Sequence, residues 1–337
     1  MIIVLRPKIS KKDEALVLKE IRRLGYKPHI MRGVARTVIG AIGDERTHHT
    51  LETLTAFPQV ESVMPVQKRF KLVSREAHPH NSTVKVQDQL IGGQKFQVMA
   101  GPCSVESEKQ LLATAHAVAE AGATVLRGGA FKPRTSPYEF QGLGEKGLKL
   151  LAKARKETGL AVITELLSEN HADMVAEYAD ILQIGARNAQ NFQLLIAAAK
   201  TGKPVMLKRG LSMKVEEWLL AGEYVLANEN PNLMFCERGI RTFETYTRNT
   251  LDLSTIPIIK KESHCPIVID PSQGAGRADL VVAMCKGAVA MGADALLIEV
   301  HPNPAEALSD GAQQLTLEGF RKLMVELKPF IAAAGRE

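Results

Sequence analysis

The feature that most constrains the fold is an alternation of short apolar runs with helix-like segments, which begins near residue 95 of the 337-residue chain. The runs are rich in β-branched and other apolar residues, as strands buried on both faces are. The segments between them carry apolar residues at helical spacing. Eight strands are predicted, over residues 95–101, 124–129, 161–166, 180–186, 204–210, 232–238, 265–270 and 295–300.

Eight strand and helix units over about 240 residues match the size of a (β/α)8 barrel, the TIM-barrel fold. The rival fold is a doubly wound open sheet, which typically holds a dinucleotide over a GxGxxG turn. None of the eight runs leads directly into such a turn. The pattern therefore favours a closed α/β barrel.

The N-terminal part of the chain follows a different order. Over residues 1–70, strand-like and helix-like segments run β-α-β-β-α-β, which is the order of the ferredoxin-like α+β fold. Residues 71–94 are polar and irregular, with room for a short hairpin. The predicted organisation is a small ferredoxin-like domain over 1–70, a linker over 71–94 and a catalytic barrel over 95–337.

Composition narrows the class of partner. No apolar run is long enough to span a membrane, and the four cysteines form no CxxC pair that would signal a zinc knuckle or a disulfide framework. The net charge is +6, yet no run of Lys and Arg interleaved with aromatic residues suggests nucleic acid. We expect a cytoplasmic protein that binds neither membrane nor nucleic acid and uses its basic residues for small anions.

Cations gather where the predicted strands end. Active sites of barrels lie at the carboxyl ends of the strands, so side chains just after each run are candidates. Each cation alone has a structural explanation, but together they would repel one another in a barrel mouth unless anions bind there. Phosphate and carboxylate suit them, because arginine offers these groups two hydrogen bonds at once. The cations are Arg127, Lys132, Arg134, Arg187, Lys208 and Arg238.

A second group of strand-end residues could hold a metal ion. Cys103, Glu299 and Asp310 follow the first and the last predicted strands, which are neighbours in a closed barrel. Gln273 follows the seventh. A thiolate with two carboxylates is a plausible set of ligands for a divalent metal.

Longer motifs carry a family resemblance. The segments AGPCSVES, LRGGAFKPRTSPYEFQGLGEKGL, QIGARNAQN, LKRG, CERGIRTFE, DPS, IEVHPNP and LSDGAQQL together resemble those of 3-deoxy-D-arabino-heptulosonate 7-phosphate (DAHP) synthases. The resemblance covers nearly the whole chain and is closest to the subgroup with an N-terminal ferredoxin-like regulatory domain. It implies a transferase that condenses phosphoenolpyruvate with erythrose 4-phosphate, the first step of the shikimate pathway of aromatic amino acid biosynthesis.

The resemblance also assigns expected roles. Phosphoenolpyruvate would be held by Arg127, Lys132, Arg187, Lys208 and Arg238, and the aldose phosphate by Arg134, Thr135 and Ser136. Lys132, Glu165 and Glu237 are the catalytic candidates. Glu165, Glu237 or a metal-bound water could carry the protons, and the sequence leaves these three alternatives open.

The metal site departs from the family pattern. The family's Cys, His, Glu and Asp ligands correspond to Cys103, Gln273, Glu299 and Asp310, so an amide replaces the imidazole. An amide oxygen is a poorer ligand than imidazole for Zn, Fe or Co and suits Mn better, so we expect a weakly bound divalent metal with Mn preferred. Gln273 is open to three interpretations: a tolerated natural variant, a deliberate substitution or a mark of lost catalysis.

The family resemblance extends to regulation. It implies that the ferredoxin-like domains pair within a homotetramer and bind an aromatic amino acid, Tyr or Phe, as a feedback inhibitor. The alternative for this domain is a dimerisation module without a ligand. For the whole chain the alternatives are a catalytically impaired barrel that senses an amino acid, and a 3-deoxy-D-manno-octulosonate 8-phosphate synthase. Those related synthases carry an Asn within the segment that reads KPRTS here, over residues 132–136.

Overall fold

The computed structural model describes residues 1–7, 9–33, 36–43, 45–64 and 69–337, without the side chains of residues 45–50. The chain divides into two compact units. One consists of Met1–Asn81 with Glu262–His264, and the other of Ser82–Lys261 with Cys265–Glu337. The segment predicted as a linker, 71–94, contributes to both units. The domain boundaries at residues 70 and 94 stay a prediction.

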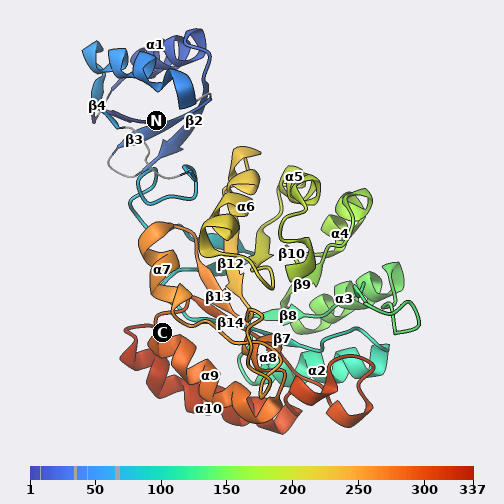
Figure 1. Ribbon diagram of the computed structural model, residues 1–337. Coiled ribbons are helices and arrows are strands. Elements are labelled where there is room, and N and C mark those ends of the chain that lie inside the picture. Colours follow the sequence, from blue (N-terminus) through green and yellow to red (C-terminus); the bar gives the residue numbers. More distant parts are fainter. Residues whose placement is uncertain (8, 34–35, 44, 65–68) are drawn as a thin grey trace. The chain divides into compact units, whose positions relative to one another are not determined.

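The small unit is built on a four-stranded antiparallel sheet in the order β2-β3-β1-β4 (Figure 1). Helix α1 (Lys11–Arg23) begins at Ser10, whose side chain accepts a hydrogen bond from the Asp13 N–H, and buries an apolar stripe. A 3₁₀ helix, η1 (Glu45–Ala56), stands where the second helix was predicted. The strands are β1 (Ile2–Leu5), β2 (Lys27–Arg32), β3 (Thr37–Ile42) and β4 (Val60–Met64).

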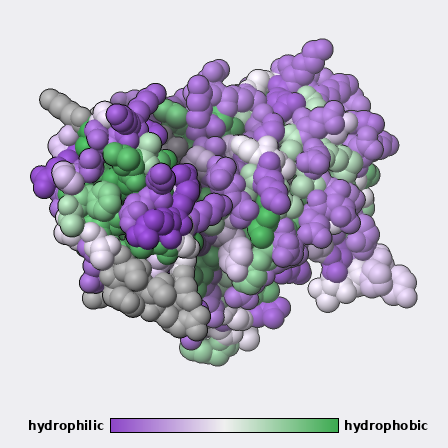
Figure 2. Space-filling model, turned by 90° about the horizontal axis from the view of Figure 1, so that it is seen from above, coloured by the Kyte–Doolittle hydropathy of each residue, from purple (hydrophilic) through white to green (hydrophobic). Residues whose placement is uncertain are grey.

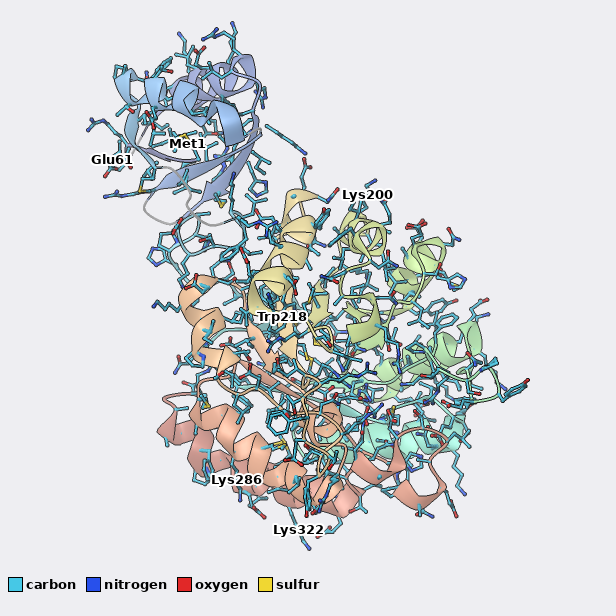
Figure 3. The ribbon with its side chains drawn as sticks, viewed as in Figure 1. Met1, Glu61, Lys200, Trp218, Lys286 and Lys322 are labelled. Atoms are coloured by element: carbon cyan, nitrogen blue, oxygen red, sulfur yellow. The ribbon has the colours of Figure 1, made fainter. Side chains whose placement is uncertain are left out.

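The ferredoxin-like order is thereby confirmed. The last strand was predicted over residues 60–66, of which 65 and 66 lie outside the described residues. The unit's core joins the sheet to α1 and η1, with Met1 (labelled in Figure 3), Ile3, Ile21 and Leu54 all buried. Burial of this apolar surface is the main stabilising contribution of the unit.

The large unit is a closed barrel of eight parallel strands, in the order β10-β11-β12-β13-β14-β7-β8-β9. Each strand lies where the sequence predicted one, so the predicted barrel is confirmed. Its strands are fully buried, as expected of a parallel sheet covered on its outer face by helices. They are β7 (Gln97–Gly101), β8 (Val125–Arg127), β9 (Ala161–Glu165), β10 (Ile181–Ile184), β11 (Val205–Lys208), β12 (Leu233–Glu237), β13 (Ile267–Ile269) and β14 (Ala295–Glu299).

Helices surround this barrel and follow its strands in turn (Figure 1). Trp218 on α6, labelled in Figure 3, packs edge-on against Phe235 and donates its indole N–H to the Leu207 carbonyl at 3.1 Å. A short helix that the sequence did not predict, α8, follows β13. The helices are α2 (Glu108–Glu120), α3 (Glu145–Thr158), α4 (Ala172–Tyr178), α5 (Phe192–Lys200), α6 (Val215–Ala227), α7 (Thr255–Glu262), α8 (Pro271–Ala275), α9 (Ala278–Ala290) and α10 (Leu317–Ala333).

A hairpin precedes the barrel. Strands β5 (Val84–Val86) and β6 (Gln89–Ile91) pair with each other, and their side chains join the apolar cluster inside the barrel. That cluster includes Val125, Ile181 and Ala295, the first residues of three barrel strands. The hairpin therefore closes the amino end of the barrel and leaves the carboxyl end for a site.

The molecular surface fits the composition. The face drawn in Figure 2 is mainly hydrophilic, and apolar residues appear there in separate groups. Among the described residues, no helix combines the length and the apolar character needed to cross a membrane.

Candidate active site

The carboxyl end of the barrel holds a polar cavity of about 260 Å³. Arg127, Glu165 and Lys208 are the last residues of their strands, so the chain delivers them to this end. The loop after β8 adds further cations. Of the side chains predicted for the site, those lining the cavity are Arg127, Lys132, Arg134, Thr135, Glu165, Arg187, Lys208, Arg238, Gln273 and Asp310.

Three guanidinium groups of the cavity have hydrogen-bond donors without partners. Arg127 Nε, Arg134 Nη2 and Arg238 Nη1 are buried and find no acceptor among the described residues. A buried donor left unpaired costs free energy, and charged donors cost the most. Burial also lowers the pKa of Arg238. These groups are therefore prepared to receive anionic oxygens.

Other cations are balanced by acids behind the cavity wall. Lys208 Nζ lies 2.6 Å from Asp270 Oδ2, and Arg127 Nη1 lies 2.9 Å from Glu299 Oε1. All four side chains are almost completely buried, where an ion pair is weakly screened. The expectation that the cations would repel unless anions bind is thus only part of the explanation, because buried carboxylates hold two of them in place.

Cys103, Glu299 and Asp310 form the predicted metal cluster. One ligand atom from each lies within 4.8 Å of the others, a spacing that fits a divalent ion. Burial, followed by the charge of Glu299, raises the pKa of the Cys103 thiol to about 11. Burial opposes the charge of Asp310, but Arg248 and Lys132 outweigh it and lower the pKa of this carboxyl to about 2. The thiol proton thus faces an ionised carboxylate, with Cys103 Sγ 3.3 Å from Asp310 Oδ2.

Gln273 joins the cluster with its nitrogen. Its Nε2 donates to Glu299 Oε1 at 3.0 Å and to Asp310 Oδ2 at 3.1 Å, while its Oε1 accepts from Arg238 Nη2 at 2.8 Å. The prediction that its carbonyl oxygen completes the metal set does not match this orientation. Three of the four predicted ligands fit a metal, and the fourth offers it no lone pair.

Glu165 is a carboxylate available to the cavity. It is 9% exposed, and its carboxylate makes no hydrogen bond within the described part of the chain. Its position depends on Gly185, since a Cβ atom there would lie 1.9 Å from Glu165 Oε1. A glycine at the end of β10 thus leaves the space that the carboxylate occupies.

Two predicted site residues lie elsewhere. Glu237 is completely buried and outside the cavity lining, because its carboxylate pairs with Arg209 Nη1 at 3.0 Å and accepts the Gly239 N–H at 2.6 Å. Burial raises the pKa of this carboxyl. Ser136 is also absent from the lining, and its hydroxyl accepts the Tyr138 N–H. Neither side chain lines the cavity, and the roles predicted for Glu237 and Ser136 stay predictions.

Sequence reasoning missed two residues of the site. Arg248 lines the cavity and donates to Asp310 Oδ1 and to Gln313 Oε1, each at 3.1 Å. Gln313 in turn donates to Glu299 Oε2 at 2.7 Å. Arg248 lies in the loop after β12, where no local signal points to the barrel mouth. Gln313 follows Asp310 by three residues within the motif LSDGAQQL, and that motif is the signal that could have found it.

Comparison with known families matches both parts of the chain. Residues 76–333 match the family described as "DAHP synthetase I family". Residues 1–68 match the "DAHP synthase ferredoxin-like domain".

Individual relatives agree with these matches. The chain is 51% identical over 335 residues to a protein named phospho-2-dehydro-3-deoxyheptonate aldolase from Thermotoga maritima, with 99% of each chain covered. A protein named 2-dehydro-3-deoxyphosphooctonate aldolase from Caulobacter vibrioides is 34% identical over 255 residues, which are 70% of this chain and 87% of that one. A crystal structure of the Thermotoga maritima DAHP synthase superposes with a TM-score of 0.80 at 50% identity, covering 100% of this chain and 98% of that one.

Proposed function

The chain belongs to the DAHP synthetase I family and is a DAHP synthase, and from this premise we propose how its barrel mouth divides between two phosphorylated substrates. The substrates are phosphoenolpyruvate and erythrose 4-phosphate. C3 of the first attacks the aldehyde carbon of the second, water adds at C2, and inorganic phosphate leaves. The proposal assigns to the chain's residues the tasks of binding, orienting and moving protons.

Phosphoenolpyruvate occupies the deep part of the cavity. Arg127, Lys132, Lys208 and Arg238 are buried cations, and Arg187 lines the cavity from its exposed side. The unpartnered donors Arg127 Nε and Arg238 Nη1 support this assignment, because a phosphate and a carboxylate would supply their missing acceptors. Fixing both anionic groups of the substrate orients the enol carbon, and such positioning supplies a large part of catalysis.

Erythrose 4-phosphate is held by the loop after β8. Arg134 is only partly buried, with Nε bonded to the Phe140 carbonyl and Nη2 without a partner. Thr135 is exposed beside it in the cavity lining. One cation and one hydroxyl near the opening suit a terminal phosphate that enters after the first substrate.

A divalent metal would be held by Cys103, Glu299 and Asp310. Bound there, it would supply Lewis-acid polarisation of the aldehyde oxygen. Lys132 belongs to the same region, since its Nζ lies 3.1 Å from Cys103 Sγ. Burial opposes its charge, but Cys103 and Glu165 outweigh burial and raise the pKa of Lys132. It therefore remains a cation that stabilises negative charge as the carbon–carbon bond forms.

Glu165 is the residue proposed for proton transfer. It faces the cavity without a hydrogen-bond partner among the described residues, whereas Glu237 is committed to Arg209. A carboxylate in this position can take a proton from the water that adds at C2. This choice narrows the three alternatives to Glu165 or a metal-bound water.

The observation that carries the proposal is the set of three buried guanidinium donors without acceptors around one cavity. The test is consumption of phosphoenolpyruvate with erythrose 4-phosphate and added Mn²⁺. Turnover that disappears when arabinose 5-phosphate replaces the aldose supports DAHP synthesis, and the reverse preference supports the octulosonate reaction. No turnover with any divalent metal would leave the amino-acid sensor.

Regulation is proposed for the small unit. Within it, a cavity of about 320 Å³ has apolar walls from Val4, Met31, Val38 and Met64, with polar groups that include Arg36, Glu76 and His78. Apolar walls with a few polar groups suit a small amphipathic ligand such as an aromatic amino acid. We take Tyr or Phe as the feedback inhibitor and a cytoplasmic homotetramer as the working form, and isothermal titration with each amino acid tests the effector.

A further inference from the structure

The orientation of the Gln273 amide follows from its neighbours. In the observed orientation Oε1 faces the Nη2 donor of Arg238, and Nε2 faces one oxygen each of Glu299 and Asp310. Turning the amide over would set its NH2 group against a guanidinium and its oxygen against two carboxylates. Three favourable hydrogen bonds, each to a charged group, would become three repulsive contacts.

The backbone of Gln273 is fixed as well. Its N–H donates to Asp270 Oδ1 at 2.9 Å, as part of the cap of α8, and its carbonyl accepts from Asn249 Nδ2 at 3.0 Å. These two hydrogen bonds hold the backbone from which the side chain extends. At the far end of the side chain, Oε1 lies 2.8 Å from Arg238 Nη2, and Nε2 lies 3.0 Å from Glu299 Oε1 and 3.1 Å from Asp310 Oδ2. Rotation away from the carboxylates would give up the Arg238 contact too.

Donors from the chain reach all four carboxylate oxygens of Glu299 and Asp310. Glu299 Oε1 receives Arg127 and Gln273, and its Oε2 receives Gln313. Asp310 Oδ1 receives Arg248, and its Oδ2 receives Gln273 and the Cys103 thiol. Every oxygen of the two carboxylates thus has a donor from the chain itself. Glu299 Oε1 and Asp310 Oδ2 each receive two donors, which use both lone pairs, so an ion that binds to either oxygen has to exchange one of these partners.

We propose that Gln273 is a competitor of the metal at Glu299 and Asp310, held in that role by Arg238, and is not a ligand. The amide nitrogen donates to one oxygen of each acid, and an ion that uses those oxygens has to displace it. The inference rests on the proposed metal set of Cys103, Glu299 and Asp310, and it opposes the expectation that the Gln273 oxygen coordinates the ion. It predicts a site that is stable when empty and exchanges its metal readily.

Direct measurement of Mn²⁺ binding distinguishes a competitor from a ligand. Metal-free full-length protein is titrated with Mn²⁺ alone, and free ion is followed by electron paramagnetic resonance. Gln273→Leu and Gln273→Ala remove the donor, and we expect each to tighten Mn²⁺ binding by about 3- to 10-fold. Unchanged or weaker binding in both variants overturns the proposal, as does the absence of Mn²⁺ binding in the wild type and in every variant. Gln97→Leu is the matched control. Gln97 is also a buried glutamine, but it lies at the amino end of β7, whereas Cys103 of the metal set follows the carboxyl end of this strand.

A second measurement uses the wild-type chain and does not depend on how the variants fold. In a crystal structure with Mn²⁺ bound, the proposal requires Gln273 Oε1 to remain on Arg238, outside bonding distance of the ion. An Oε1 atom within the coordination sphere overturns it. Consumption of phosphoenolpyruvate by the same protein in solution tests the proposed function separately. A failure of the competitor role of Gln273 is therefore distinguishable from a failure of the proposed function.

Discussion

The Nζ atom of Lys132 lies 3.1 Å from Cys103 Sγ and 3.1 Å from the Cys103 carbonyl oxygen. One cation thereby belongs to the anion cavity and to the thiol of the metal cluster at once. Its stem also passes close to Gly129, where an added Cβ atom would come within 2.8 Å of Lys132 Cδ. The two halves of the site are joined through this side chain.

Replacement of Lys132 should therefore remove more than a binding contact. We expect Lys132→Met to lower kcat/KM by about 100- to 1000-fold, the usual cost of losing a preorganised electrostatic donor. Steady-state consumption of phosphoenolpyruvate measures the effect. Lys149→Met is the control, because Lys149 is exposed and pairs with Glu145 on the surface of α3. Activity within a factor of three of wild type would remove Lys132 from the proposed machinery.

Metal removal should suppress turnover. Treatment with a chelator is expected to lower activity at least about tenfold, and Mn²⁺ should restore it. Full activity after exhaustive chelation would contradict a catalytic metal at Cys103, Glu299 and Asp310.

Gln273→His should bind Mn²⁺ more tightly than wild type by more than about 10-fold, because imidazole replaces a hydrogen-bond donor with a metal ligand.

Loss of the Glu165 carboxylate should affect kcat. Glu165→Gln is expected to reduce kcat by about 100-fold with little change in the KM for phosphoenolpyruvate, since general acid–base groups contribute on that scale. Glu237→Gln serves as the contrast. It breaks a buried pair with Arg209, which keeps Asp252 as a second partner, so its main effect should be on the free energy of unfolding, by about 1–3 kcal/mol. Equal kinetic losses without a stability difference would argue against this division of roles.

Gly185→Ala tests the same carboxylate without touching it. A methyl group would come 1.9 Å from Glu165 Oε1, so the side chain has to move. We expect a loss of kcat comparable to that of Glu165→Gln, together with a melting temperature near that of wild type. The double variant separates a shared cause from two independent ones: if Glu165 is the only target, adding Gly185→Ala to Glu165→Gln costs little further activity.

Acid should destabilise the unit that contains His264. Burial lowers the pKa of this ring to about 4 from 6.5, and its Nε2 lies 2.8 Å from the Leu72 carbonyl oxygen. The unfolded chain binds the proton near the ordinary pKa and the folded chain does not, so stability is complete above that value and falls as the pH drops toward 4. The loss should reach roughly 3 kcal/mol.

Urea unfolding at about pH 7 and about pH 4.5 measures this loss. His264→Gln keeps an N–H donor for Leu72 and cannot be protonated in this range, so its stability should depend less on pH. A variant with the same acid sensitivity as wild type would mean that other groups cause the loss.

The sequence predicts the barrel and much of its mouth because several strands end at residues of the site. Arg127, Lys208 and Glu299 are last residues of strands, and a parallel barrel brings such ends together. Arg248 could not be predicted, since its loop returns to the mouth through tertiary contacts alone, whereas Gln313 could have been found from its place next to Asp310. Helix α8 did have a local signal, Asp270 as N-cap before Pro271, that periodicity over so short a segment does not reveal.

The orientation of the Gln273 amide could not be predicted from the sequence either. Sequence alone shows that an amide stands where the family has an imidazole, and an amide can either accept or donate. Arg238 decides between the two, because its Nη2 takes the oxygen and turns the nitrogen to the acids. A residue at the end of β12 thus sets the chemistry of a residue on α8.

Asp270 has a bearing on how this site tolerates mutation. Its Oδ2 receives Lys208 Nζ, and its Oδ1 receives the Gln273 N–H that begins α8. A substitution at position 270 would release Lys208 and remove the cap of α8 in a single step, whereas a change of the side chain at position 273 leaves both in place. This arrangement lets the side chain at position 273 alter metal binding without disturbing the helix that carries it, a separation that position 270 does not have.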